Sequence, residues 1–476
     1  MDTTLFSGVR PGVEHISVST CFRLPDYRIS DMDCEEKNMN PVRRIAVYGY
    51  GTYGKRTCES FRLYWGDAYE VTAIFDRQPA GRTDPCWKLP VLLPEELEPA
   101  FVRGTFDAVM ICIYHWDMYR EVAAWLKNLG IPVFLPGRKE DFGDPSCFEQ
   151  EPCPDISVSR NHYRFHVYRN MCGAVADYGR KQFLFLFSEA GRVNIDSYRK
   201  YLELDAFGVY LRSYPFRFKN PLPEKIFMEG EWCPIVKFLS NNYWHFTFET
   251  ADCVYLMEKA GYRGKYICNL TPFAEEMLQL LGVERSRIVS TDKLEMHKTY
   301  VFEKLYDINH EGLKALEFSA EAVPEMAAVI RAQLQRDDRY PKKLYVSRIG
   351  FRKLLNGEEV AVRNGFTVMI PEEHSLREQM EYFYNAEIVL CPHGANSTNF
   401  LYMREGTVFA EIFSDRWHKD INADICEGCG VHYLQMTGRK AAQDRRFGMY
   451  ADYTVDEDDL QRLISRAEKI RAGQEG

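Results

Sequence analysis

A histidine and a glycine, His393 and Gly394, stand where an apolar segment meets the start of a helix pattern. The apolar segment 386–391 is typical of a buried strand, and the helix pattern covers 397–405. A glycine at such a turn lets a ligand approach the backbone, and the N–H groups of a first helical turn attract anions. An imidazole beside them can donate to that anion or exchange a proton with it. These residues favour a nucleotide diphosphate as ligand; the alternative is an ordinary turn with a packed histidine.

Basic side chains follow a second strand pattern, 343–347. Ser347 and Arg348 end that strand, and Arg352 comes four residues after Arg348. Parallel sheets bind ligands beyond the carboxyl ends of their strands, and a guanidinium group can hold phosphate oxygens in pairs. The segment therefore favours phosphate binding, although a solvated basic loop is the commoner reason for such a charge run.

Two carboxylates are placed where they need a partner. Glu249 is four residues after His245, at the start of a predicted helix over 242–259, so the two side chains share one helix face. A histidine paired with a carboxylate can act as a general base, and a simple hydrogen bond on the helix surface is the alternative.

Glu411 interrupts an apolar strand at 408–413, where it requires a ligand hydroxyl or an arginine.

A glycine pattern lies near the other end of the chain. Gly49, Gly51 and Gly54 follow the apolar strand 45–48, and Asp76 ends a second strand 22 residues after the last glycine. This arrangement matches the dinucleotide-binding fingerprint, in which the acid holds a ribose. The alternative is a degenerate nucleotide fold that is kept for packing or docking.

The composition narrows the class of protein. The chain has 476 residues, 46% of them hydrophobic and 27% charged, which suits several folded domains. Its formal charge of −9 provides no general attraction for nucleic acid. No segment approaches the roughly 20 apolar residues of a membrane span, and the start of the chain does not resemble a signal peptide. The 14 cysteines show no framework spacing, which favours reduced thiols in the cytoplasm. Only Cys426 and Cys429 form a CxxC pair, for which metal or redox use is the minor alternative.

Strand and helix patterns alternate in three regions, which predicts an α/β fold class with parallel sheets. The first region is a doubly wound unit of about 100 residues from residue 44. The second begins near Lys225 and the third near Lys343. The charged run 336–339 between the last two is typical of an exposed hinge, and a cleft between two α/β halves is a common ligand site.

Four motifs in the second half occur together in a particular order. They are NYWHFTFE at 242–249; YVSR at 345–348 with Arg352, Asn356, Glu358 and Glu359; EHSLREQ at 373–379; and HGANSTN at 393–399 with Met403, Gly406 and EIF at 411–413. Together these motifs resemble glycosyltransferase family 61, which includes capsular polysaccharide biosynthesis enzymes, and the resemblance covers residues 225–437. The residues after the histidine-glycine-alanine motif, Asn396 and Ser397, depart from the small or apolar residues often found there in the family.

This resemblance implies a GT-B type pair of Rossmann-like halves, here preceded by a separate small Rossmann-like domain. It also implies inversion of the anomeric centre without a metal site. His245 or Glu249 would then be the catalytic base. The donor would be bound by Ser347, Arg348, Arg352, His393, Gly394, Ala395, Thr398, Asn399 and Glu411. The implied domains are a tail or cap (1–40), a Rossmann-like nucleotide-binding domain (41–140), a connector (141–224), an N-terminal acceptor half (225–338), a C-terminal donor half (339–440) and a C-terminal helix (441–476).

The expected function is therefore transfer of a sugar from a nucleoside diphosphate, with UDP favoured, to a hydroxyl of a glycan or lipid-linked glycan. The product would be a surface or capsular polysaccharide. No cofactor is required for transfer, and a nucleotide or dinucleotide is expected at Gly49, Gly51, Gly54 and Asp76. Residues 44–136 resemble a module appended to some bacterial sugar-modifying enzymes and acyltransferases, a likeness that implies no particular ligand. The rivals are an NAD(P)-binding oxidoreductase and a catalytically dead nucleotide-sensing scaffold. A homodimer and peripheral contact with the inner face of the membrane are left open.

Overall fold

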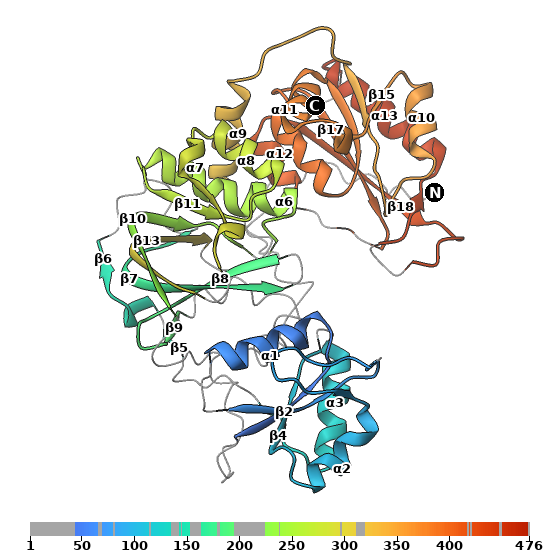
Figure 1. Ribbon diagram of the computed structural model, residues 1–476. Helices are drawn as coiled ribbons and strands as arrows, with labels where there is room; N and C mark the ends of the chain where they lie inside the picture. Colours follow the sequence, from blue (N-terminus) through green and yellow to red (C-terminus); the bar gives the residue numbers. More distant parts are fainter. Residues whose placement is uncertain are drawn as a thin grey trace. The chain divides into compact units, whose positions relative to one another are not determined.

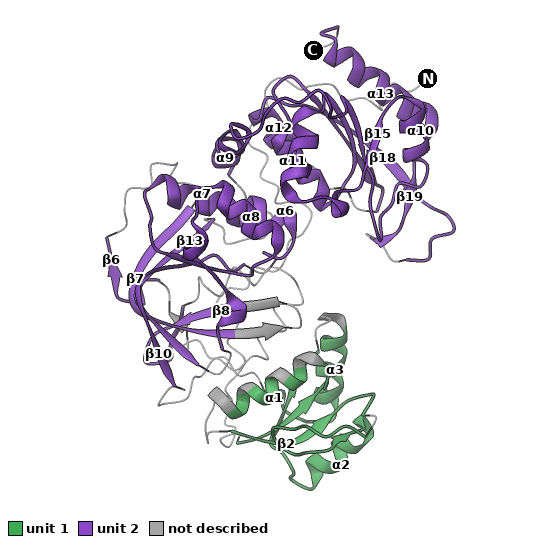
Figure 2. Cartoon of the chain, turned by 45° about the horizontal axis from the view of Figure 1, so that its top comes forward, with its two compact units in different colours: residues 1–62, 67–142, 202–217 green, residues 63–66, 143–201, 218–476 purple. Residues whose placement is uncertain are grey.

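The computed structural model describes residues 43–64, 69–79, 81–113, 116–134, 142–143, 145–152, 163–178, 181–194, 224–237, 239–295, 298–310, 319–416, 418, 421–446 and 450–474. The chain divides into two compact units (Figure 2). Unit 1 comprises residues 1–62, 67–142 and 202–217, and unit 2 comprises residues 63–66, 143–201 and 218–476. The tail predicted at 1–40 lies outside the described residues. None of the described helices is long and apolar enough to cross a membrane.

Unit 1 is a parallel sheet with helices on both faces (Figure 1). Apolar side chains of α2 and α3 pack on one face of the sheet. Across the sheet, the third strand of the chain lies beside the second, the second beside the first, and the first beside the fourth, which is half of a doubly wound fold. The strands are β1 (Arg44–Tyr48), β2 (Glu70–Phe75), β3 (Val91–Leu92) and β4 (Ala108–Ile111), and the helices are α1 (Thr52–Tyr64), α2 (Leu97–Val102) and α3 (Trp116–Asn128).

The strands predicted near residues 45, 71 and 108 are confirmed, whereas β3 was not anticipated because it is only two residues long. The expected closing strand at 131–135 forms only a single parallel bridge between Val133 and Val109.

Unit 2 contains two sheets. The first lies in the order β12-β11-β10-β13-β7-β8-β9, with β6 beside β7. Its strands are β6 (Gln150–Glu151), β7 (Tyr163–Tyr178), β8 (Lys181–Phe187), β9 (Val193–Asn194), β10 (Lys225–Pro234), β11 (Lys265–Cys268), β12 (Ile288–Ser290) and β13 (Thr299–His310). A further short strand, β5, spans Phe142–Gly143.

The parallel part of this first sheet, β12 to β13, repeats the strand order of unit 1. Strand β7 pairs antiparallel with β13 along ten residue pairs, from Tyr300 opposite Gly173 to His310 opposite Tyr163. Residues 163–194, within the segment expected to be a connector, thus supply strands to this sheet. The helices that follow the strands are α6 (Tyr243–Phe246), a π-helical turn η6 (Thr247–Ala251), α7 (Asp252–Lys259), α8 (Pro272–Leu280) and α9 (Ala322–Arg331).

The second sheet of unit 2 has the order β15-β14-β16-β17-β18-β19. All of its pairings are parallel except that of β18 with β19. Chain order reverses between β14 and β16, so the topological switch point lies there. The strands are β14 (Lys343–Val346), β15 (Thr367–Met369), β16 (Ile388–Pro392), β17 (Val408–Ser414), β18 (His432–Lys440) and β19 (Tyr453–Thr454). The helices are α10 (Gly357–Arg363), α11 (Leu376–Asn385), η10 (Ala395–Tyr402), α12 (Ala423–Gly428) and α13 (Glu457–Arg471).

Alternation along these strands separates two cores. Ile388 and Leu390 point into a core that includes side chains of α10 and α13. Val389 and Cys391 point into a larger core that α7, α8, α9 and η10 share. That larger core joins the two sheets of unit 2 through their helices, so the side chains of α6 and η10 can meet.

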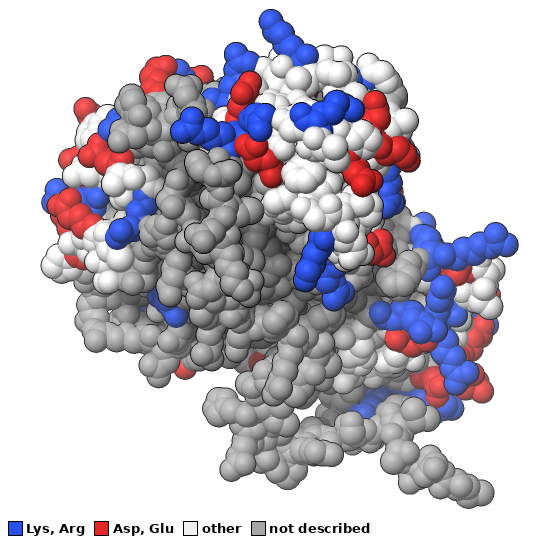
Figure 3. Space-filling view, turned by 90° about the horizontal axis from the view of Figure 1, so that it is seen from below, with Lys and Arg blue, Asp and Glu red and all other residues white. Residues whose placement is uncertain are grey.

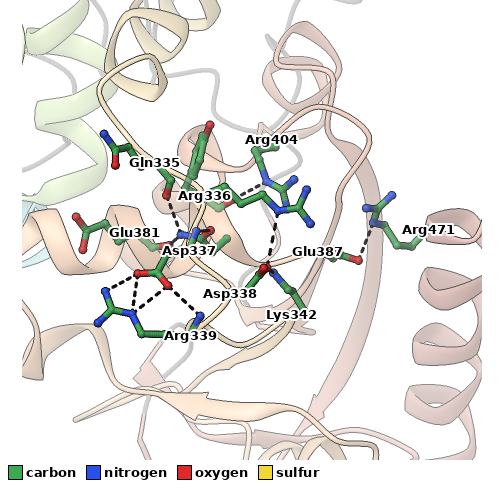
Figure 4. A network of polar contacts seen from close by, with 12 residues as sticks. Gln335, Arg336, Asp337, Asp338, Arg339, Lys342, Glu381, Glu387, Arg404 and Arg471 are labelled. Atoms are coloured by element: carbon green, nitrogen blue, oxygen red, sulfur yellow. Dashed lines mark hydrogen bonds and ion pairs between the residues drawn. The ribbon is translucent and has the colours of Figure 1, made fainter.

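The charged run 336–339, between the two sheets of unit 2, is hydrogen-bonded to the end of α11. The backbone N–H of Asp337 donates to Oδ1 of Asn385 over 2.8 Å, and Nδ2 of Asn385 donates to the carbonyl of Glu381 over 2.9 Å. Asp337 also pairs with Arg339 (Figure 4). Because Asn385 is fully buried at the end of α11, its paired amide anchors the backbone of this run at Asp337. The predicted exposure of the run is confirmed, since the side chains of Arg336, Asp338 and Arg339 are exposed, and its role as a hinge stays a prediction. Elsewhere on the described surface, Figure 3 shows basic and acidic side chains interspersed.

Candidate functional site

The dyad of His245 and Glu249 is formed within one helix. Asn242 caps the helix, since its side chain accepts from the backbone N–H groups of Trp244 and His245. Nδ1 of His245 lies 2.9 Å from Oε1 of Glu249, and the two side chains are 15% and 6% exposed. An ionised carboxylate can only accept, so Nδ1 then carries the hydrogen and Nε2 keeps its lone pair. The predicted pairing is confirmed, and the arrangement suits a proton acceptor; its catalytic role stays a prediction.

The helix is distorted at this dyad. Glu249 lies in the π-helical turn η6, and the ammonium group of Lys237 donates to its backbone carbonyl. The same ammonium lies 3.4 Å from Sγ of Cys253. A π turn leaves carbonyls without their ordinary helical partner, and here a buried cation satisfies one of them. Lys237 therefore helps to hold Glu249 in place, although nothing in the local sequence pattern singled it out.

A second histidine–carboxylate pair lies at the end of the other sheet. Nδ1 of His393, which follows β16, lies 2.7 Å from Oε1 of Glu411 in β17. Asn422 donates to both carboxylate oxygens over 3.0 and 3.1 Å, and the Tyr433 hydroxyl donates over 2.8 Å. Glu411 is fully buried. Among the described residues its carboxylate thus accepts from His393, Asn422 and Tyr433, which differs from the arginine pair that was one of the two alternatives, and it orients the imidazole of His393. A donor contact by Glu411 stays a prediction.

Arg348 lies against the turn that contains Gly394. Its Nη1 donates over 2.7 Å to the backbone carbonyl of His393, and a Cβ on Gly394 would collide with its guanidinium group. Burial lowers the pKa of Arg348. Burial and then the charge of Arg348 lower the pKa of Arg352 to about 10. Two largely buried cations therefore lie close enough to repel each other, an arrangement that an anion between them would stabilise.

The backbone of Arg352 is also unusual. Its φ of 61° lies in the left-handed region, which costs a residue other than glycine roughly 1–2 kcal/mol. The ring of Phe351 lies under both guanidinium groups, 5.6 Å from the carbon of Arg348 and 5.8 Å from that of Arg352. Strained conformations cluster at functional sites. Ser347 was also expected to bind the donor. Its hydroxyl donates to Glu358 over 3.0 Å and thereby connects its loop to α10.

The turn after β16 is a 3₁₀ helix, η10, in place of the helix predicted over 397–405. Oγ of Ser397 donates to the carbonyl of Gly394 over 2.7 Å. Ala395, which begins η10, is partly buried and packs against the larger core. Thr398 is fully buried, and its hydroxyl has no hydrogen-bond partner among the described residues. A buried hydroxyl normally has a partner, so Thr398 could hydrogen-bond a ligand that enters the turn.

The dyad helix packs directly on this turn. The hydroxyl of Tyr243 donates to Oδ1 of Asn399 over 2.7 Å, while Nδ2 of Asn399 donates to Gln379 over 3.0 Å. Phe248 stacks on Phe400 with 6.4 Å between ring centroids. The amide of Asn399, expected to contact the donor, is therefore engaged within the protein and connects the two halves of unit 2.

A chain of one ring contact and several hydrogen bonds also links the two histidines. The ring of His245 contacts that of Trp244 with centroids 5.0 Å apart, and Nε1 of Trp244 donates to Asn422 through a long hydrogen bond of 3.5 Å. Asn422 binds Glu411, which binds His393. The sequence motifs contained neither Asn422 nor Tyr433, because only the fold brings these residues to the carboxylate.

The residues predicted to bind a nucleotide in unit 1 lie together at the start of α1. Gly49 has φ of 96°, and a Cβ there would lie 2.8 Å from the carbonyl oxygen of Cys112. A Cβ on Gly54 would collide with the carbonyl of Gly49, so both glycines permit close packing. Gly51 has open space where its Cβ would lie, so packing does not require it.

Asp76 is already engaged by its own unit. Its carboxylate accepts from the backbone N–H of Tyr50 over 2.5 Å and of Gln78 over 2.8 Å. It also pairs with Arg82 at 3.0 Å. A ribose hydroxyl at this acid would compete with those contacts, and nucleotide binding here stays a prediction.

Two groups of residues could suggest a metal. Burial raises the pKa of the Cys426 thiol and raises that of Cys429 to about 11, which keeps the CxxC pair protonated. A cluster that no motif revealed comprises Asp252, Cys253 and His310. Burial, followed by the charge of Asp252, raises the pKa of Cys253 to about 12, and the ammonium of Lys237 lies beside its sulfur. A protonated thiol beside an ammonium group does not suit a cation.

Residues 243–410, about a third of the chain, match the family model described as Glycosyltransferase 61. No curated protein matches the chain. The matched segment contains both histidines, Glu249 and the two arginines, and it ends just before Glu411. The enzyme is therefore a glycosyltransferase, which takes a nucleotide-sugar donor and a glycan acceptor.

Proposed function

We propose that this glycosyltransferase inverts the anomeric centre of a sugar carried by a nucleoside diphosphate, with UDP favoured, and that it requires no metal. The two sheets of unit 2 would be the two halves of a GT-B fold. The observation that carries the proposal is the position of Arg348 and His393. They follow β14 and β16, the two strands that flank the switch point of the second sheet, and one hydrogen bond joins them.

The donor diphosphate would lie against Arg348, Arg352 and the turn that begins at His393. Negative charge grows on the leaving group as the glycosidic bond breaks, and preorganised cations stabilise that charge. The lowered pKa of each arginine supports this assignment, because burial makes both cations costly without an anion. The hydroxyl of Thr398 would supply a neutral donor in the same turn.

The acceptor hydroxyl would lose its proton to Nε2 of His245, which Glu249 orients through Nδ1. Direct action by Glu249 is the second choice. Deprotonation by a positioned base is typically worth about 100- to 10,000-fold in rate. Support comes from the contact between the dyad helix and the turn, through Tyr243 and Asn399.

The biological product would be a surface or capsular glycan made at the cytoplasmic side of the membrane, and the enzyme could contact that membrane peripherally or dimerise. An oxidoreductase centred on unit 1 is less favoured, because Asp76 is occupied by Tyr50, Gln78 and Arg82. A catalytically dead scaffold is the remaining rival, and it would bind the donor without cleaving it.

One set of measurements tests the proposal. We expect UDP to raise the melting temperature of the full chain and NAD to leave it unchanged. We also expect slow hydrolysis of at least one sugar in a panel of UDP and GDP sugars, insensitive to EDTA and with inverted product by NMR. Stabilisation by NAD alone would support the redox rival. Donor hydrolysis that persists in a His245→Ala variant would contradict the assigned base.

A further inference from the structure

Unit 1 has a pocket whose lining contains none of the residues to which a catalytic or binding role is assigned above. It lies at the carboxyl edge of the four-stranded sheet and has a volume of about 470 Å³. Tyr48 ends β1, Arg77 follows β2, residues 93–95 follow β3, and residues 121–125 belong to α3. Parallel sheets bind ligands at this edge, and small-molecule sites typically measure about 300–1,000 Å³. Both position and size therefore suit a small ligand.

Aromatic and apolar side chains form the inner wall of the pocket. Tyr48 is only 4% exposed, and its ring lies 5.8 Å from that of Trp125 at a tilt of 58°. Val122 is buried beside them in the same core. Packing fixes these side chains before any ligand binds, and the partly exposed ring of Trp125, with the small exposed part of Tyr48 beside it, is the apolar surface that a ligand can contact. Such a surface suits the C–H face of a sugar ring as well as a nucleobase.

Charged groups form the outer wall. Arg77, Glu95 and Glu121 are exposed, and no hydrogen bond or ion pair joins any of them to another described residue. Arg44 of the same unit, in contrast, pairs with Asp107 at 2.6 Å. The pocket thus offers unused hydrogen-bond donors on one guanidinium group and unused acceptors on two carboxylates.

The sign of these charges decides between ligands. Two carboxylates and one guanidinium give the wall an excess of negative charge, which repels a phosphate or diphosphate. A neutral ligand with many hydroxyl groups suffers no such repulsion. Each hydroxyl can donate to a carboxylate or accept from the guanidinium. A neutral saccharide therefore matches both walls, whereas a nucleotide matches only the aromatic one.

We propose that this pocket of unit 1 binds a neutral saccharide, with a sugar ring against Tyr48 and Trp125 and its hydroxyls bonded to Arg77, Glu95 and Glu121. It is a binding site and not a reaction centre. The assignment does not depend on the transfer reaction proposed for unit 2.

The test uses the full chain on an array of neutral oligosaccharides, followed by calorimetric titration of each hit and of UDP and NAD. We expect at least one neutral saccharide to bind. Each of Arg77→Gln and Glu121→Gln should weaken it about tenfold or more, the effect of losing a hydrogen bond to a charged group. Glu98→Gln is the matched control, since Glu98 is an exposed residue of α2 outside the pocket.

Three outcomes would overturn the proposal: no hit on the array, a hit that the pocket substitutions leave unchanged, or a hit that Glu98→Gln weakens equally. Binding of UDP or NAD that is lost on Glu121→Gln would assign the pocket to a nucleotide instead. Donor hydrolysis measured in the same Arg77→Gln and Glu121→Gln variants should be unchanged, so failure of saccharide binding remains distinguishable from failure of the transferase assignment.

Discussion

Arg348 occupies the space over Gly394 that the side chain of any other residue would require. Gly394 has an extended backbone, with φ of 163° and ψ of −169°, which any residue can adopt. Conformational freedom therefore does not explain this glycine. Its missing Cβ does, because the guanidinium group of Arg348 lies there and donates to the preceding carbonyl. The glycine of the turn thus accommodates the guanidinium group of Arg348, whether or not a ligand also approaches the backbone there.

Replacing Gly394 with alanine should therefore act through Arg348. In the proposed mechanism Arg348 stabilises the leaving group, so we expect Arg348→Ala to lower kcat by about 100- to 1,000-fold. Gly394→Ala should displace the guanidinium group and reduce kcat by a comparable factor. Because both changes remove one interaction, the double variant should be little worse than either single variant. Donor turnover measured for all three proteins checks this.

Arg363→Ala provides the control for that cycle. Arg363 is an exposed arginine of α10 that pairs with Glu457 at 2.8 Å, and neither residue belongs to the turn that contains Gly394. Its replacement should leave turnover within about twofold, as expected for an exposed ion pair worth under about 1 kcal/mol. Fully multiplicative losses in the double variant would show that Arg348 and Gly394 act independently, against the steric relationship.

The base can be identified from two substitutions in the dyad. If Nε2 of His245 receives the proton, His245→Ala should lower kcat by about 100- to 10,000-fold. Glu249→Gln should lower it less, because the imidazole remains and loses only its orientation. The pH dependence of kcat distinguishes the two groups: the low-pH limb should vanish in His245→Ala and survive in Glu249→Gln. The reverse pattern would make Glu249 the direct base.

Strands and helices with continuous or strictly periodic apolar residues were predictable from the sequence. Strand β16 and the helix expected over 242–259, which comprises α6, η6 and α7, were located to within about two residues, because buried parallel strands and amphipathic helices have strong patterns. Strand β13 was not expected. It carries Asp307, Asn309 and His310 among its apolar residues, and their partners become evident only in the fold: Asp307 and Asn309 bond each other, and His310 bonds Asp252 of α7. Its backbone pairs with β7, more than a hundred residues earlier.

The same distinction applies to the site. The contact of His245 with Glu249 was predictable because helical spacing is local. The partners of Glu411 were not, since they come from the end of β16, from the residue before α12 and from β18. Buried carboxylates require partners, but the chain sequence does not reveal which elements supply them.

Glu411 should contribute to stability as well as to the site. Glu411→Gln places an amide where the carboxylate accepts from His393, Asn422 and Tyr433, so donors would face one another. An unsatisfied buried group costs about 1–3 kcal/mol. We expect a loss of that size in the free energy of unfolding, measured by urea denaturation of the full chain. Glu427→Gln, an exposed change in α12, should cost under about 0.5 kcal/mol. Equal losses in both variants would contradict the network.

The buried pair of Asp252 and His310 predicts a specific dependence of stability on pH. Burial raises the pKa of Asp252, but the charge and hydrogen bond of His310, the charge of Lys237 and the hydroxyl of Tyr163 lower it to below its ordinary value. A carboxyl whose pKa is lower in the folded state stabilises the fold above its unfolded pKa of about 3.9, and loses that effect as pH falls through the folded value. Asp252→Asn removes a buried carboxylate and leaves His310 and Tyr163 facing an amide, so we expect it to reduce the free energy of unfolding at pH 7 by about 1–3 kcal/mol.

That difference between Asp252→Asn and the unmodified chain should shrink as pH falls below about 4, because the carboxyl of the unfolded chain then takes up a proton that the folded carboxylate binds only at lower pH. Urea denaturation at pH 7, 5 and 3.5 measures it, with the exposed Asp424→Asn as the control at each pH. A constant difference across this range would mean that the carboxylate charge contributes nothing and that Asp252 acts only as a hydrogen-bond acceptor. Since Asp252 begins α7, directly after the π turn that holds Glu249, the same variants measured for donor turnover would show whether this buried pair also positions the dyad.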